Sequence, residues 1–283
     1  MTVQTSLYEY PLALDCDLES VEVFEGLALT RLDDATRERL LGISDLKLDE
    51  VGQVKSYARK GDLAHFLSPD FDQKMVYYAS NFLLTTSNTD LANDFNFALK
   101  LLGSTWSSLF IGYQQGGRGM AFCAPPGYFG KVRQRLDEKV LSELQTILKE
   151  IRKRNNDAKL GLMRDIWMYA MSDAPRRTSR FVEVSTLLEI LVLPKQSTEL
   201  GFRFALRLAK LSAKLGYDDP VVAFDKAKML YSIRSKLVHS GSDDRLEHHG
   251  HVANELARRL LVQYLVSPEI FSEDALDKLC IAA

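Results

Sequence analysis

The second half of the chain repeats apolar and polar positions with the period of an α-helix. Apolar residues recur at steps of three and four along four segments, which predicts helices over residues 178–193, 198–215, 220–239 and 246–266. The connections between these segments are short, which is typical of an antiparallel bundle. A longer amphipathic helix is predicted from Val132 through Ile151, ending near Asn155, and a shorter helix is predicted over residues 160–171.

The first half of the chain has a mixed pattern. It predicts a short strand over Val21–Phe24, a helix from Asp34 to Leu41, and one or two helices over residues 71–102, interrupted by a turn near residues 85–88. Strand-like runs at 106–113 and 120–123 flank a glycine-rich segment, which indicates a β-hairpin. The fold class predicted is mainly α: an antiparallel helical bundle over residues 131–283, preceded by a smaller α+β domain over residues 1–130.

One predicted bundle helix, over residues 220–239, carries an arginine within its apolar stripe. Steps of three and four along this helix place Arg234 on one face with Ala227, Tyr231 and Val238. A solvated arginine would not normally occupy such a position. Arg234 is therefore a candidate functional residue, and the alternative is a structural arginine paired with an acid such as Glu189.

The same helix has a marked start and a marked end. Asp218 and Asp219 can cap it, Pro220 suits the first helical position, and Ser240-Gly241 supplies the stop. His239 falls in the last turn or just beyond it, where the helix dipole favours the protonated imidazole; its alternative role is a C-terminal cap. A regular helix would rotate Arg234 and His239 about 140° apart. Both can therefore face one target only if the helix ends between them, or if a second copy of the chain completes the site.

These residues resemble a known family. The segment Tyr231-x-x-Arg234-Ser235-Lys236-Leu237-Val238-His239-Ser240-Gly241 is similar to the signature of the HEPN family, in its Apea-like branch. That branch opens with a helix that carries an acid after an apolar pair, as in Leu187-Leu188-Glu189-Ile190-Leu191, followed by a helix like that of residues 204–211. The resemblance covers residues 176–267.

The resemblance implies a metal-independent endoribonuclease that acts on RNA as a homodimer and uses no cofactor. Arg234 and His239 would be catalytic: His239 as general acid or base in an attack by a ribose 2′-hydroxyl, and Arg234 as the group that holds the scissile phosphate. Ser235 and Glu189 would support them. The implied role is antiviral defence, toxin-like growth control or RNA processing. Residues 1–130 would sense or regulate, and a regulatory or antitoxin protein would be a further partner.

Two other functions stay open at this point. The first is a catalytically silent HEPN dimer that binds nucleic acid or a partner protein. The second is a metal-dependent hydrolase, because imidazole and carboxylate groups are common metal ligands. Its ligands would come from His248, His249 and His251, with Asp243 and Asp244 just upstream.

The charge of the chain is distributed unevenly around a net value of −2. Residues 1–130 hold 10 Lys and Arg against 17 Asp and Glu, whereas residues 131–283 hold 26 against 21. Residues 131–180 alone hold 13 basic against 7 acidic residues, including Arg152-Lys153-Arg154 and Arg176-Arg177. Clustered basic charge of this kind suits a polyanion such as RNA, and a solvated helix surface is the plainer interpretation.

Cysteine usage and hydropathy bear on the compartment. The three cysteines, Cys16, Cys123 and Cys280, are widely spaced and form no Cys-x-x-Cys, which argues against a disulfide scaffold or a zinc ribbon. No apolar run of membrane-spanning length and no signal peptide pattern is found in the sequence. We therefore expect a cytoplasmic protein without a membrane partner.

Overall fold

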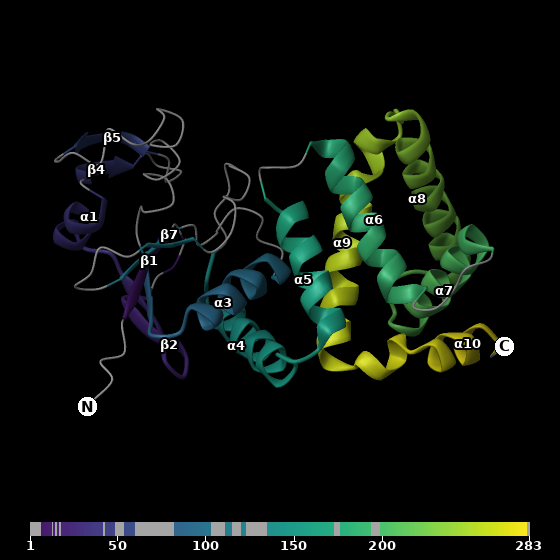
Figure 1. The fold of residues 1–283 in the computed structure, drawn as a ribbon, viewed down its shortest axis with the longest axis horizontal. Helices are drawn as coiled ribbons and strands as arrows, with labels where there is room; N and C mark the ends of the chain where they lie inside the picture. The colour runs from purple at the N-terminus through teal and green to yellow at the C-terminus, as the bar shows by residue number, and fades with distance from the viewer. Residues whose placement is uncertain are drawn as a thin grey trace. The chain divides into compact units, whose positions relative to one another are not determined.

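The computed structural model describes residues 7–12, 14, 16, 18–41, 43–48, 54–59, 82–102, 111–114, 120–122, 135–172, 176–193 and 199–281. The protein is mainly helical, with an antiparallel sheet in its N-terminal part (Figure 1). The chain divides into two compact units, Met1–Arg152 with Met171–Asp173, and Lys153–Ala170 with Ala174–Ala283. The predicted domain boundary at residues 130–131 lies outside the described residues. Residues 135–152, which the prediction assigned to the helical domain, belong to the first unit.

The first unit contains a sheet with the strand order β2-β3-β6-β1-β7-β8, in which all neighbouring strands are antiparallel. A separate pair, β4 with β5, is also antiparallel. Side chains that alternate along the central strands, such as Tyr10 and Leu12 of β1 and Leu84 of β6, are fully buried. The strands are β1 (Tyr8–Leu12), β2 (Ser20–Phe24), β3 (Leu27–Arg31), β4 (Ile43–Leu48), β5 (Val54–Arg59), β6 (Phe82–Thr86), β7 (Ile111–Gln114) and β8 (Met120–Phe122).

Three described helices accompany this sheet: α1 (Asp34–Leu41), α3 (Thr89–Leu101) and α4 (Glu138–Lys153). Asn88 caps α3, because its side-chain oxygen accepts hydrogen bonds from the N–H groups of Asp90 and Leu91. Almost all of α3 is buried, and its Asp94 carboxylate accepts a hydrogen bond at 3.0 Å from Arg152 of α4. This pair joins α3 to α4 within the first unit.

Several predictions for this unit are confirmed. The strand at residues 20–24, the helix at residues 34–41 and the hairpin between Ile111–Gln114 and Met120–Phe122 are all present. The helix predicted before the turn at residues 85–88 is wrong at residues 82–84, because Phe82–Thr86 forms β6 between β1 and β3. Pairing on both sides satisfies its backbone groups, and this outweighs the local pattern. Residues 71–81 lie outside the described residues.

The second unit is helical. It comprises α5 (Ala158–Ala170), α6 (Arg177–Val192), α7 (Leu200–Lys214), α8 (Pro220–Ser240), α9 (Leu246–Val266), the 3₁₀ helix η2 (Pro268–Phe271) and α10 (Glu273–Ile281). The four helices predicted for the bundle, now α6 to α9, are confirmed to within two residues at each end. Their fully buried side chains include Leu188 of α6, Leu211 of α7, Ile233 of α8 and Leu261 of α9.

The directions of these helices place three helix ends together. The first turns of α6 and α9 line one pocket, so both helices begin at the same end of the unit. Helix α9 begins at Leu246, six residues after α8 ends at Ser240, so the end of α8 belongs there too (Figure 1). Within the described ranges no helix is both long and apolar enough to cross a membrane.

Candidate functional site

Helix α8 carries the two predicted catalytic residues and is well defined at both ends. The Asp219 carboxylate accepts a hydrogen bond at 2.9 Å from the N–H of Val221, and Pro220 occupies the first turn. At the other end, Gly241 adopts a left-handed conformation with φ of 76°, and its N–H donates to the carbonyl of Leu237 at 2.9 Å. The predicted start and stop of this helix are both confirmed.

Arg234 lies at the margin of the buried face of α8. Its side chain is 28% exposed, whereas Val238, one turn further on, is 51% exposed. The face predicted through Tyr231, Arg234 and Val238 is therefore the edge of the apolar stripe and not its centre. The physical reason is the direction of packing, which buries Ala223, Ala227, Leu230, Ile233 and Leu237 instead.

Glu189 of α6 holds Arg234. The Arg234 Nη2 group donates to the Glu189 Oε2 atom at 3.2 Å, and the Glu189 side chain is 22% exposed. Burial raises the pKa of the Glu189 carboxyl, and the charge of Arg234 opposes that rise. The Nε atom of Arg234 is buried and has no hydrogen-bond partner in the described part of the chain. A buried donor without a partner is uncommon in folded proteins, so Arg234 is not fully explained as a structural residue.

His239 lies in the last turn of α8, and its side chain is exposed. The helix remains regular through Ser240, so it does not end between Arg234 and His239. Five residues of helix separate the two side chains by about 140° around the axis and about 7.5 Å along it. One chain therefore does not aim Arg234 and His239 at the same point, and a site that uses both needs a second chain.

Ser235, the remaining predicted supporting residue, is half-buried on α8. It follows Arg234 directly, so its side chain points about 100° away around the helix axis. Of the predicted set, the structure brings together Arg234 and Glu189, and it leaves Ser235 and His239 in other directions on the same helix.

The connection after α8 is fixed by a buried carboxylate that the sequence pattern suggested only as a metal ligand. Asp243 accepts hydrogen bonds from Arg245, at 2.9 Å from the backbone N–H and at 2.6 Å from Nη2. These contacts lower the pKa of Asp243 to about 2. The Asp-x-Arg spacing, in which a side chain accepts from the N–H two residues later, is the local signal that could have revealed this turn. Asp243 thus fixes the path of the chain between His239 and α9.

The alternative metal site at the start of α9 does not gather in the described residues. No group of three or more His, Cys, Asp or Glu side chains among them is placed to hold a metal ion. His248, His249 and His251 lie at different positions around the first turns of α9, and Asp243 is already bound to Arg245.

Comparison with known proteins finds no family model that matches the chain, and no match among curated proteins or solved structures.

Proposed function

We propose that the protein is a HEPN-type, metal-independent endoribonuclease that acts as a homodimer, with Arg234 and His239 converging across the interface. One observation carries this proposal: α8 holds a half-buried, Glu189-bound arginine and an exposed terminal histidine in directions that only a second chain can combine. The arrangement also agrees with the sequence resemblance, which implies a dimeric site.

The two side chains suit cleavage of an RNA strand by its own 2′-hydroxyl. A histidine acting as general base takes the 2′-OH proton as O2′ bonds to phosphorus. The bond from phosphorus to O5′ then breaks, and an imidazolium acting as general acid gives O5′ a proton. In each site one His239 takes both roles in turn, first as the neutral base and then, once protonated, as the acid. The guanidinium of Arg234 stabilises the negative charge that develops on the phosphoryl oxygens.

Glu189 and Ser235 have supporting roles in this proposal. Glu189 accepts a hydrogen bond from Arg234 and limits the orientations open to its guanidinium. Ser235 supplies a polar group beside Arg234 on the helix. The first unit would then sense a signal or bind a regulatory protein, in antiviral defence or toxin-like growth control.

The second candidate is a catalytically silent HEPN dimer that binds nucleic acid or a partner protein. The observation that favours it is the ion pair itself, because Arg234 already has a counter-ion within its own chain. The two candidates differ in one measurable property, which is cleavage of RNA that depends on Arg234 and His239.

The test is incubation of the purified protein with mixed RNA in EDTA, with fragments followed on a gel. We expect wild type to cleave and His239→Ala to lose at least about 100-fold in rate, as for loss of a general acid or base. His248→Ala is the matched control, because His248 is also exposed and lies nine residues further along the chain. Failure of wild type to cleave, or equal cleavage by His239→Ala, would contradict the nuclease proposal.

Mixing two inactive variants tests whether the site spans two chains. Arg234→Ala and His239→Ala are unfolded together, refolded and assayed. If each site takes Arg234 from one chain and His239 from the other, heterodimers carry one intact site, and activity recovers to about a quarter of wild type for random pairing. If the site lay within one chain, the mixture would stay inactive.

A further inference from the structure

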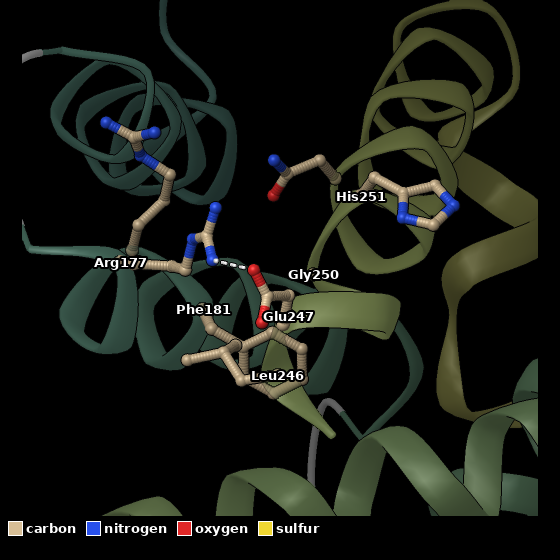
Figure 2. A pocket seen from close by; sticks show the side chains of 8 residues that line it. Arg177, Phe181, Leu246, Glu247, Gly250 and His251 are labelled. Atoms are coloured by element: carbon tan, nitrogen blue, oxygen red, sulfur yellow. Dashed lines mark ion pairs between the residues drawn. The ribbon is translucent and has the colours of Figure 1, made fainter. Parts of the chain in front are cut away.

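A pocket of about 230 Å³ lies between the first turns of α6 and α9. Figure 2 shows it from close by, with the Arg177 side chain of α6 and the Glu247 side chain of α9 meeting between the two helices. Its apolar part is formed by Phe181 of α6 and Leu246 of α9, which are 2% and 6% exposed. Its polar part includes Arg177 and Arg180 of α6 and Asn254 of α9. The His251 imidazole points away from Arg177 (Figure 2).

The charges in this pocket favour an anion. Among the residues that line it, two are arginines and one, Glu247, is an acid, and Glu247 pairs with Arg177 at 3.6 Å. Both side chains of that pair are largely exposed, at 69% and 72%, so the pair is weak and a bound anion can compete with Glu247 for Arg177. Asn254 adds a neutral group that can donate a hydrogen bond.

The helix dipoles act in the same direction. The pocket receives the positive ends of α6 and α9, since residues from the first turn of each helix line it. Neither Arg176 nor Arg245, the residues at the two N-caps, forms a side-chain cap. The dipoles add to the positive charge of Arg177 and Arg180, two residues whose guanidinium groups carry several hydrogen-bond donors each.

The pocket lies at the end of the unit where His239 is found. Helix α8 ends at Ser240, and the Asp243–Arg245 contacts fix the short connection from there to Leu246 at the pocket. A polyanion bound at His239 therefore lies at the same end of the unit as the pocket arginines.

We propose that this pocket binds one phosphate group of an RNA strand, through the guanidinium groups of Arg177 and Arg180. This inference rests on the proposed function and names a contact that helps to hold its substrate. Planar guanidinium groups match the geometry of phosphate oxygens, and the small volume accommodates one phosphate with part of its nucleotide. The phosphate is either a backbone phosphodiester or a terminal phosphate, and these two sources share the same chemistry.

The experiment measures the affinity of fluorescent 2′-O-methyl RNA for the full-length protein in EDTA, by anisotropy. This RNA has no 2′-hydroxyl and cannot be cleaved by 2′-hydroxyl attack. We expect Arg177→Gln and Arg180→Gln each to weaken binding by about 10-fold, as for loss of a charge-assisted hydrogen bond. The slope of log K against log salt should fall by about 0.7 for each phosphate contact removed.

Two further variants sharpen this test. Arg176→Gln removes an equal charge from the exposed neighbouring residue, which does not line the pocket, and should change affinity less than twofold. Glu247→Gln removes the competing acid and should tighten binding. Equal weakening by Arg176→Gln and the pocket variants would show that only general surface charge is involved, and would overturn the proposal, as would unchanged binding in both pocket variants.

Two arms separate the sources of phosphate and the two proposals. Oligonucleotides with and without a 5′-phosphate distinguish a terminal site, which needs that group, from a backbone site, which does not.

Cleavage of ordinary RNA separates the pocket proposal from the nuclease proposal. Arg177→Gln and Arg180→Gln should raise KM and leave kcat unchanged, whereas His239→Ala lowers kcat. If binding depends on both pocket arginines but cleavage is absent or independent of His239, the pocket stands and the nuclease proposal fails. If His239 governs cleavage but neither arginine affects binding, the pocket proposal fails alone.

Discussion

At the scale of single residues, the balance between burial and charge at Glu189 decides what Arg234 can do. Burial disfavours the ionised carboxylate, and Arg234, at 3.2 Å, favours it. The first effect is the larger one, so the pKa of Glu189 is raised from its ordinary value of 4.5. A raised pKa means that the folded protein binds the proton more tightly than the unfolded chain, so this carboxyl reduces stability as the pH rises through that range.

Removal of the arginine charge should therefore raise the pKa of Glu189 further. In Arg234→Met the opposing charge is gone while most of the packing volume remains, and the ¹³C shift of the Glu189 carboxyl should titrate at higher pH than in wild type. Arg234→Lys retains the charge and should give a smaller rise. An unchanged titration in Arg234→Met would show that the two groups are not coupled.

At the scale of elements, a buried arginine attaches the last helix to the bundle. Arg207 of α7 is 2% exposed and donates to Glu273 and Asp277, both on α10. It also donates at 3.1 Å to the carbonyl of Val192, the last residue of α6. One guanidinium thus links the ends of α6 and α10 to α7, and its contacts are satisfied only when all three helices are packed.

Replacement of this arginine should release α10 before the rest of the unit. Arg207→Met removes the buried guanidinium that Glu273 and Asp277 share, and we expect a loss of about 3 kcal/mol in the free energy of unfolding, as for a broken buried ion pair. Amide hydrogen exchange should increase over residues 273–281 more than over α9. Arg203→Met is the matched control on the same helix, because Arg203 is 37% exposed and pairs with Glu199 only at 3.8 Å. Equal protection of α10 in both variants would contradict this prediction.

At the scale of the whole molecule, the proposed dimer needs an apolar contact on α8 close to Arg234 and His239. Val238 lies between them in sequence, shares a helical face with Arg234 and is 51% exposed. We infer that Val238 is covered when two chains meet, because a symmetric interface buries the same patch of both subunits.

The molar mass in solution tests this inference. Val238→Asp should shift the protein from dimer to monomer in light scattering coupled to size exclusion, and abolish RNA cleavage. Val266→Asp is the control, since Val266 is 57% exposed at the end of α9 and should leave the dimer intact. A wild-type protein that is monomeric at assay concentration, or a Val238→Asp protein that stays dimeric, would contradict the proposed arrangement.

The sequence alone determined the features that depend on neighbours along the chain. The helical period placed α6 to α9, and the Asp219, Pro220 and Gly241 signals located both ends of α8, because capping and backbone preference act within a few residues. The run of Thr, Ser and Asn at residues 85–88 likewise indicated the turn before α3. This local pattern could not show that residues 82–86 pair with β1 and β3.

Tertiary structure decided the rest, because the groups involved come from distant parts of the chain. Arg234 meets Glu189 across 45 residues, and Arg207 meets α10 across 66 and 70. The pocket exists because α6 and α9 begin at the same end of the unit, which no local pattern specifies. The sequence could name Arg234 and His239 together, but only the uninterrupted helix showed that one chain points them in different directions.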